Sequence, residues 1–440
     1  MSGVKDGATG GPNHPIVVAP TESRFWSLPD GVRLAGEPGE AAGVTYPEGF
    51  AGSGVAVGLK HSRRPDMGVL AVVPPWREGA TSAAVFTRNA FAAAPIQLNR
   101  AECELGAYVA VIVNSGNANA CTGRPGLSVA RAMQHACAET LKVPAARVAV
   151  GSTGIIGVQL DEVFMAEGAK KAAAAVQPAG GSDFNKAMMT TDRFQKTCAM
   201  DVETSDGSVR LGVCAKGAGM ISPAMATMLC VVTTDAVVSA TDMQSTLQRA
   251  VERSFNRVTV DGEMSTNDSV FFMSSGASGV RLAAAGLLQF AVALESLLMR
   301  IALMMVADGE GAEKIMRLQV VGAETDRDAA AVARAIADSP LVKTAMHGGD
   351  PNWGRIISSA GAAMAGRSLP ASELRLGGVK VVEGGAASEV AEGDKERMRA
   401  EMRGPEVDIW LDLGLGDSST ELFFADMGHE YVTINAEYHT

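Results

Sequence analysis

Residues 215–236, AKGAGMISPAMATMLCVVTTDA, are the stretch around which the rest of the chain is organised. It passes from Lys216 in a glycine-rich loop to the pair Ala226 and Thr227, and then into the apolar run 228–232. That run predicts a buried strand. A small residue before a threonine at the start of a strand suits a chain that cuts itself. The Oγ of Thr227 can attack the Ala226 carbonyl, because alanine crowds the approach little and the glycines permit a bent backbone.

Hydrolysis of the resulting ester would make Thr227 the first residue of a second chain. Its α-amine, with a reference pKa of roughly 7.7–8.0, would then be a general base on the same residue as the nucleophilic hydroxyl. The alternative is a Gly-Pro loop that enters a core strand, with Thr227 merely hydrogen-bonded. The local pattern alone favours that alternative, because short motifs are weak hypotheses.

Composition limits the classes of function. The chain has 440 residues, of which 47% are hydrophobic, enough for a large core. A net charge of −11 with scattered Lys and Arg argues against a nucleic-acid partner. The six cysteines lie apart without CxxC spacing, which indicates free thiols in a reducing compartment. The six dispersed histidines form no HExxH motif, so we expect no metal site.

Two further segments bear on the location of the protein. Residues 287–306 are the most hydrophobic, but Gln289, Glu295 and Arg300 interrupt them, so a core helix is preferred to a membrane span. Residues 1–42 are rich in Gly, Pro and charge and contain no secretory apolar segment. We interpret them as an N-terminal extension, and a targeting leader is one explanation for it.

Alternation of strand-like and helix-like patterns predicts an α/β class. The expected strands cover residues 55–59, 68–73, 108–113, 148–150 and 258–260, followed by antiparallel strands within 374–382, 407–413 and 421–425 and a strand-like tail at 431–434. The expected helices cover residues 127–141, 158–186, 241–255, 287–306 and 329–337.

Two loops rich in glycine or asparagine follow predicted strands. Residues 114–119 contain asparagines and a glycine, which tolerate positive φ. A structural loop and the wall of a site are therefore equally open interpretations of this stretch. Residues 151–157, GSTGIIG, are expected to turn from a strand towards a helix near Leu160, and such a turn can direct backbone N–H groups at an oxyanion. A plain turn is the alternative. Nucleotide binding is disfavoured because neither GxGxxG nor GxxxxGK[ST] occurs.

Other polar residues have an ordinary and a functional interpretation. Thr190 and Thr191 before Asp192 suit a helix cap or a substrate contact. Lys216 is ordinarily a surface lysine, and DGEG at 308–311 is ordinarily a solvated turn. The acidic stretch 261–268, DGEMSTND, lacks the spacing of a calcium loop.

Several blocks together are far more specific than any one motif. With the segment around Thr227 they resemble the ornithine acetyltransferases, the bifunctional glutamate N-acetyltransferases of arginine biosynthesis, from about Gly43 to Thr440. The departure from the family is Glu263 and Met264, where related proteins usually have Asp and Thr, and it leaves the role of that loop open. The matching blocks are VNSGNANACTG (113–123), STGIIG (152–157), MMTTD (188–192), SFNRVTVDGEMSTND (254–268), DGEG (308–311), HGGDPNWGR (347–355) and INAEYHT (434–440).

The resemblance implies a layered α/β sandwich akin to N-terminal-nucleophile hydrolases. Cleavage between Ala226 and Thr227 would give an alpha chain, 43–226, and a beta chain, 227–440, assembled as a heterotetramer of two alpha and two beta chains. The implied reaction moves acetyl from N2-acetyl-L-ornithine to L-glutamate. Acetyl-CoA is a possible second donor, and no cofactor or metal is expected.

The resemblance also implies residue roles. Thr227 is the nucleophile, Thr153 and Gly154 form the oxyanion hole, and the substrate contacts are Thr190, Lys216, Thr227, Glu310, Asn435 and Thr440. Two other classes of function stay open: a self-processing amidohydrolase or aminopeptidase with water as acceptor, and an inert substrate-binding homologue. The expected location is the plastid stroma in a plant or alga, and otherwise the bacterial cytoplasm.

Overall fold

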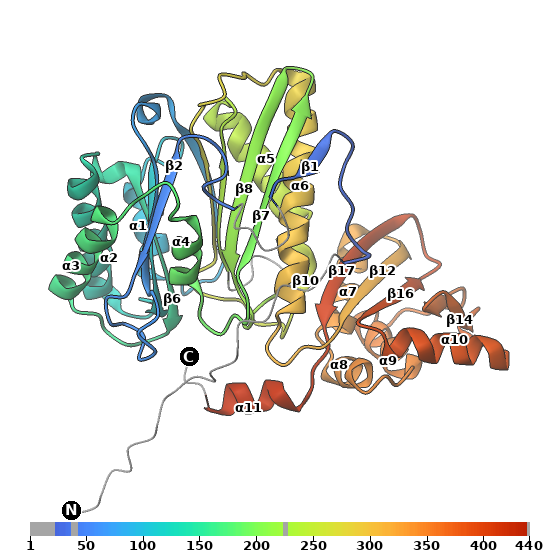
Figure 1. Cartoon of the computed structure of the whole chain (residues 1–440). Coiled ribbons are helices and arrows are strands. Elements are labelled where there is room, and N and C mark those ends of the chain that lie inside the picture. Colours follow the sequence, from blue (N-terminus) through green and yellow to red (C-terminus); the bar gives the residue numbers. More distant parts are fainter. Residues whose placement is uncertain (1–22, 37–42, 223–227, 438–440) are drawn as a thin grey trace, which may run out of the picture.

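The computed structural model describes residues 23–36, 43–222 and 228–437 (Figure 1). The strands are β1 (Val32–Leu34), β2 (Phe50–Val55), β3 (Met67–Val72), β4 (Thr81–Phe86), β5 (Ala110–Asn117), β6 (Val148–Ile155), β7 (Lys196–Thr204), β8 (Gly207–Lys216), β9 (Leu229–Thr234), β10 (Val258–Thr259), β11 (Ser269–Ser274), β12 (Ile315–Ala323), β13 (Glu373–Leu376), β14 (Val379–Glu383), β15 (Ala386–Ala387), β16 (Glu406–Asp412) and β17 (Ser418–Ala425). The helices are α1 (Ala94–Glu102), α2 (Gly123–Leu141), α3 (Glu162–Ala174), α4 (Gly181–Met188), α5 (Ala240–Glu252), α6 (Ala284–Ala307), α7 (Asp326–Ala337), α8 (Pro340–His347), α9 (Trp353–Ala363), α10 (Glu392–Arg403) and α11 (His429–Glu437).

Two sheets packed face to face form the main body. The six-stranded sheet has the order β1-β7-β8-β9-β11-β4, and the four-stranded sheet has the order β2-β3-β5-β6. Helices α1, α2 and α3 pack on the outer face of the smaller sheet, while α5 and α6 pack on the outer face of the larger one (Figure 1). The molecule therefore has the predicted layered α/β fold, with helices enclosing two sheets.

Strand β9 lies in the middle of the larger sheet, antiparallel to β8 and parallel to β11. Its side chains alternate between two cores: Leu229 and Val231 face the smaller sheet, whereas Cys230 and Val232 face the helices. Burial on both faces explains the continuous apolar run in the sequence. The core strand predicted after Thr227 is thus confirmed, while Ala226 and Thr227 themselves lie outside the described residues.

A second unit, whose core is built from residues after α6, lies beside the main body. Its seven-stranded sheet has the order β10-β17-β12-β16-β13-β14-β15, and helices α7 to α10 accompany it (Figure 1). The expected antiparallel pairing holds for β13 with β14 and with β16. Strand β12, which the sequence analysis missed, pairs parallel with β16 and antiparallel with β17.

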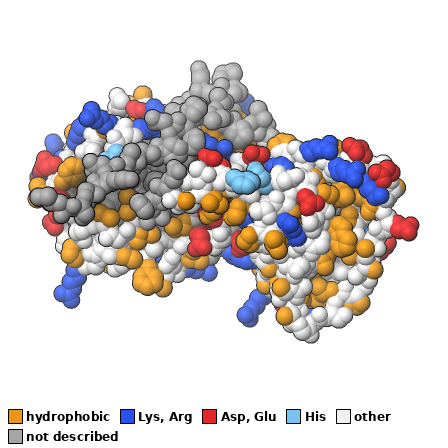
Figure 2. Space-filling view, turned by 90° about the horizontal axis from the view of Figure 1, so that it is seen from below, with side chains coloured by type: hydrophobic (Ala, Val, Ile, Leu, Met, Phe, Trp, Pro, Cys, Tyr) orange, Lys and Arg blue, Asp and Glu red, His pale blue; other side chains and the backbone are white. Residues whose placement is uncertain are grey.

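Helix α6 is the one helix among the described residues that is long and apolar enough to cross a membrane. Phe290, Leu294, Leu297 and Ile301 are fully buried in the core that α6 shares with the six-stranded sheet. The predicted core helix is confirmed. On the face shown in Figure 2, basic and acidic side chains are interspersed.

Some local predictions were wrong. GSTGIIG is not a turn, because β6 continues to Ile155 by pairing Thr153 and Gly154 with β5, and α3 begins only at Glu162. The helix expected over 158–186 is two helices, α3 and α4. Strand β2 ends at Val55, where a strand was expected to begin.

The tail at 431–434 is helical, within α11, rather than a strand. The Thr433 hydroxyl donates to the His429 carbonyl one turn earlier, at 3.3 Å, and no described strand pairs with this segment. An apolar run of four residues suits a helix or a strand equally well, so its period alone does not decide between them.

Candidate active site

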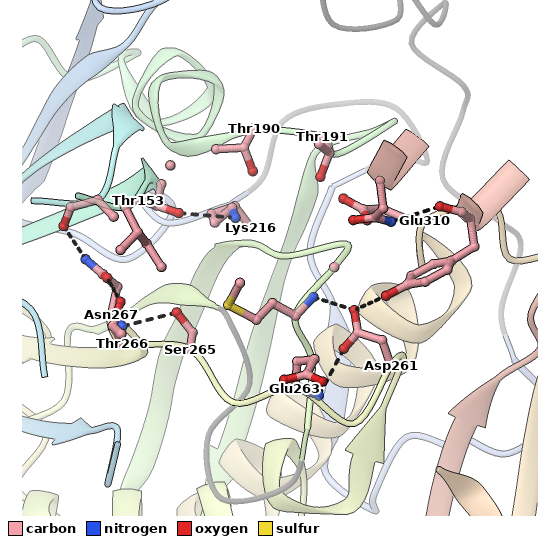
Figure 3. A pocket seen from close by; sticks show the side chains of 17 residues that line it. Thr153, Thr190, Thr191, Lys216, Asp261, Glu263, Ser265, Thr266, Asn267 and Glu310 are labelled. Atoms are coloured by element: carbon pink, nitrogen blue, oxygen red, sulfur yellow. Dashed lines mark hydrogen bonds between the residues drawn. The ribbon is translucent and has the colours of Figure 1, made fainter. Parts of the chain in front are cut away.

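A cavity of about 140 Å³ lies where β6, β8, the loop 261–267 and helix α11 meet (Figure 3). It brings together six of the predicted site residues: Thr153, Gly154, Thr190, Lys216, Glu310 and Asn435. The predicted residues Ala226, Thr227 and Thr440 lie outside the described residues. The full lining is Ala118, Thr153, Gly154, Ile156, Thr190, Thr191, Lys216, Gly219, Met220, Asp261, Glu263, Ser265, Thr266, Asn267, Glu310, Tyr431 and Asn435.

One wall carries a hydroxyl and a cation. Thr153 projects from β6, and Lys216 is the last residue of β8, with only 3% of its surface exposed. The Lys216 Nζ lies 3.4 Å from the Thr153 Oγ1. Burial lowers the pKa of Lys216, and the nearby Asp192 carboxylate opposes that effect.

Gly154 brings the backbone itself to the cavity wall. Its φ is +132°, a conformation that side-chain-bearing residues rarely adopt. A Cβ there would lie 2.4 Å from the Gly116 carbonyl carbon and 2.5 Å from the Asn117 nitrogen. Glycine is therefore required where β6 passes this irregular part of β5.

Glu310 supplies a carboxylate from the other side of the cavity (Figure 3). Its backbone N–H donates to the Ala218 carbonyl at 2.9 Å, and the Asn435 Nδ2 of α11 donates to its Oε2 at 2.8 Å. A Cβ on Gly219 would lie 2.6 Å from the Glu310 carboxyl group, so a larger residue would displace it. A lysine and a carboxylate lining one small cavity suit a zwitterionic ligand such as an amino acid.

The loop 261–267 contributes lining residues to which the sequence analysis assigned no role. The Asp261 carboxylate accepts the N–H groups of Met220 and Ile221 at 2.6 and 2.8 Å, and Tyr431 donates to it at 3.4 Å. Burial raises the pKa of Asp261 to about 6. The matching block at 254–268 was the signal that pointed to this loop. Tyr431 is a further lining residue without an assigned role, and Thr191, for which a cap or a substrate contact was left open, also lines the cavity.

Asn267 joins this loop to the wall that carries Thr153. Its Nδ2 donates to the Ala118 carbonyl at 2.6 Å and to the Ser152 carbonyl at 2.8 Å. Ala118 belongs to the asparagine-rich loop and lines the cavity, while Asn119 holds that loop by donating to Gly126. The turn expected over 114–119 is wrong for its first four residues, because β5 continues to Asn117 by pairing with β6. Ala118 lines the cavity, which agrees with the site-wall interpretation.

Met228, the residue after Thr227, is tied to the same loop. Its N–H donates to the Asp268 Oδ1 at 3.0 Å, and Asp268 is fully buried. Burial raises the pKa of Asp268 well above its usual range. Within the described ranges, no group of three or more His, Cys, Asp or Glu side chains is arranged to hold a metal ion.

Comparisons with known proteins agree with the resemblance. The model of the ArgJ family matches residues 51–440. The arginine biosynthesis bifunctional protein ArgJ of Nitratidesulfovibrio vulgaris is 42% identical, covering 89% of this chain and 98% of that protein. The protein of the same name from Symbiobacterium thermophilum is 40% identical, covering 91% of this chain and 99% of its own.

Among solved structures, an ornithine acetyltransferase from Mycobacterium tuberculosis, complexed with ornithine, is 34% identical. It covers 45% of this chain and 100% of its own, with a TM-score of 0.38. The family match over residues 51–440 and relatives at 40% identity or more, matched over nearly their whole length, decide the assignment. The chain belongs to the ArgJ family.

Proposed function

We propose that this protein moves acetyl from N2-acetyl-L-ornithine to L-glutamate in arginine biosynthesis. The observation that carries the proposal is the single cavity shared by Thr153, Gly154, Thr190, Lys216, Glu310 and Asn435. These residues are up to 282 positions apart in the sequence, and the family resemblance implies a site role for each of them.

The reaction begins with self-cleavage. The Thr227 Oγ attacks the Ala226 carbonyl, the peptide C–N bond breaks, and water hydrolyses the resulting ester. Thr227 then carries a free α-amine. In each turnover its hydroxyl attacks the acetyl carbonyl of acetylornithine while the amine takes the hydroxyl proton.

The oxyanion of the tetrahedral intermediate is held by Thr153 and Gly154. Breakdown of that intermediate expels ornithine, whose nitrogen takes the proton from the Thr227 amine, and leaves an acetyl ester on Thr227. The α-amine of glutamate then attacks the ester, releases N-acetylglutamate and restores the hydroxyl. No cofactor takes part in these steps.

The two charged lining residues give the cavity its proposed selectivity. Lys216 neutralises a substrate carboxylate, and Glu310 holds an ammonium group. Ornithine and glutamate both carry these groups, so one site can accept each in turn. This supports a double displacement in which the donor leaves before the acceptor enters.

The arrangement of strands supports the proposed processing. Strand β9, from the predicted beta chain 227–440, lies between β8 of the alpha chain 43–226 and β11. Fragments cut at residue 226 would therefore stay joined through a shared sheet and core. We propose the fold to be of the N-terminal-nucleophile type and the assembly to be a heterotetramer of two alpha and two beta chains. Residues 1–42 are then an extension whose strand β1 adds to the six-stranded sheet by pairing with β7.

The word bifunctional in the names of the relatives supports acetyl-CoA as a second donor. The relatives described above are bacterial, which supports the bacterial cytoplasm as the location, whereas nothing in the comparisons supports the plastid alternative.

Initial-rate kinetics test the proposal. Double-reciprocal plots at several fixed glutamate concentrations should be parallel, and labelled ornithine should exchange into acetylornithine without glutamate. Converging plots without exchange would contradict the covalent route. Release of acetate at full rate without glutamate would identify an amidohydrolase instead. An uncut, inactive chain would indicate a binding protein.

A further inference from the structure

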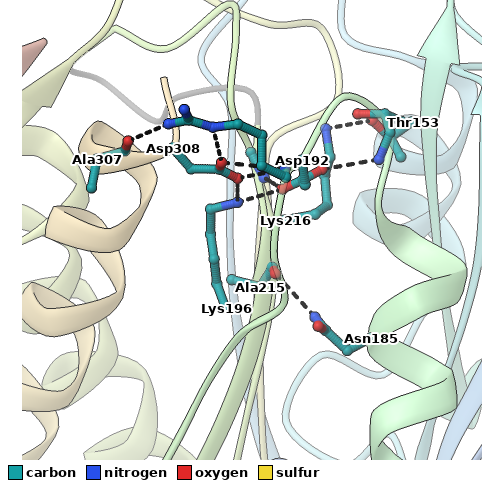
Figure 4. Close-up of polar contacts among 11 residues, drawn as sticks. Thr153, Asn185, Asp192, Lys196, Ala215, Lys216, Ala307 and Asp308 are labelled. Carbon is teal, nitrogen blue, oxygen red and sulfur yellow. Dashed lines mark hydrogen bonds and ion pairs between the residues drawn. The ribbon is translucent and has the colours of Figure 1, made fainter. Parts of the chain in front are cut away.

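A network of buried charges lies next to Lys216, one of the residues that line the cavity (Figure 4). The Lys196 Nζ contacts the Asp192 Oδ1 at 2.6 Å and the Asp308 Oδ2 at 2.5 Å. All three side chains are completely inaccessible to solvent. Arg193 extends this network with a contact of 3.0 Å from its Nε to the Asp308 Oδ1.

Asp192 also holds the backbone beside two proposed substrate contacts. Its Oδ2 accepts the N–H of Thr190 at 2.9 Å, and its Oδ1 accepts the N–H of Gly217, the residue after Lys216, at 2.7 Å. At the other end of this network of charges is Asp308, which lies two residues before Glu310 in the sequence. The buried charges therefore connect Thr190 and Lys216 with Glu310.

The charges within this network depend on one another. Burial alone would raise the pKa of Asp192, but Lys196, Lys216 and the Gly217 N–H lower it below its usual range. Burial alone would lower the pKa of Lys196, but Asp192 and Asp308 raise it. Buried ion pairs are often no more stabilising than apolar residues of similar volume, so stability alone is a poor reason for this network.

We propose that Asp192 is a positioning residue of the acetyl-transfer site, which fixes Thr190 and Lys216 and, through Lys196 and Asp308, sets their place relative to Glu310. This inference rests on the proposed function. The network also crosses the proposed cleavage point, since Asp192 and Lys196 belong to residues 43–226 and Asp308 to residues 227–440. After cleavage, the Lys196–Asp308 pair would keep the two halves of the substrate site in register.

Asp192 has a second effect, on the charge of Lys216. The ionisable groups that act on Lys216 are the carboxylates of Asp192, Glu310 and Asp268 and the ammonium groups of Lys196 and Lys60. Burial lowers the pKa of Lys216, and Asp192 is the group that raises it most. Without its charge, Lys216 would lose its proton at a lower pH and would cease to attract a substrate carboxylate there.

The test is Asp192→Asn, measured by ornithine binding with calorimetry and by kcat/KM for acetylornithine across pH. We expect weaker ornithine binding and a higher KM by about tenfold or more, because an ionic hydrogen-bonding group is lost. The alkaline limb of kcat/KM should move to lower pH. The matched control is Asp235→Asn, a buried carboxylate at the far end of β9 that accepts the Arg210 N–H at 2.8 Å.

The proposal fails if Asp192→Asn lowers the melting temperature as Asp235→Asn does but leaves ornithine affinity, KM and the alkaline limb unchanged. Should Asp192→Asn not fold, the double variant Asp192→Asn with Lys196→Met removes both charges of the pair. It should show the same weakened binding but a smaller pH shift, because Lys196 itself lowers the pKa of Lys216. Normal ornithine binding by this variant would overturn the proposal. Absence of acetyl exchange in the wild type would refute the proposed function separately, since the binding comparison does not depend on turnover.

Discussion

Replacement of Glu310 by Gln tests how the cavity holds the amine of its substrates. The side chain is partly buried, and Asn435 occupies only its Oε2, which leaves Oε1 to accept from an ammonium group. Glutamine keeps the shape, and its carbonyl oxygen can still accept from Asn435. The change therefore removes charge while preserving the local packing.

The expected magnitude follows from this geometry. Hydrogen bonds to charged groups contribute about 1.5–3 kcal/mol, and partial exposure places Glu310 near the low end of that range. That corresponds to about a tenfold weaker binding of both ornithine and glutamate. Self-cleavage should be unaffected, because the precursor carries no substrate.

The assay compares Glu310→Gln with Glu263→Gln, which removes a negative charge from an exposed carboxylate lining the same cavity. Calorimetry gives the two affinities, and kinetics give the KM for each substrate. If Glu310→Gln weakens binding no more than Glu263→Gln does, Glu310 does not hold the amine. If Glu310→Gln weakens the binding of only one of the two substrates, the proposal that both share one amine site is wrong.

Three further outcomes are expected. Thr153→Ala should lower kcat by about 10²–10³ with little change in melting temperature, because an oxyanion donor is lost, and a comparable loss of stability would indicate a structural role. Gly154→Ala should cost about 1–3 kcal/mol in chemical denaturation as well as activity, because of its positive φ and the clash with Gly116, and unchanged stability would contradict this geometry. The pKa of Asp261 rises on folding from 3.8 to about 6, so the folded state holds a proton that the unfolded chain has released, and wild-type stability falls as pH rises through this window. The melting temperature of Asp261→Asn should therefore improve relative to the wild type from pH about 4 to about 6, and a constant difference would argue against the raised pKa.

The pattern of apolar residues in the sequence predicted the strands and helices that are deeply buried in the core. Strand β9 and helix α6 were predicted because each is an apolar run of the right length, and the burial of both is confirmed. The turn expected at GSTGIIG failed for a physical reason. Glycine permits a turn but also permits the close approach of Gly154 to Gly116, and only the neighbouring strand decides between them.

The site residues were predicted from sequence blocks that match a known family, and not from the chemistry of their neighbours in the sequence. Lys216 and Glu310 have ordinary local surroundings in sequence, and nothing in their spacing reveals that they line one cavity. The sequence shows Asp192 only as the residue after two threonines. Its partners are Lys196, the first residue of β7, and Asp308, directly after α6, and only the fold brings them together. Long-range ion pairs of this kind leave no period in the sequence.

Mass spectrometry of the purified protein, incubated with acetylornithine in the absence of glutamate, tests the central claim most directly. The account predicts a fragment whose first residue is Thr227, carrying one acetyl group as an ester on that residue, and loss of the acetyl group when glutamate is added. An active protein that remains one uncut chain, or an acetyl group carried on another residue, would contradict it.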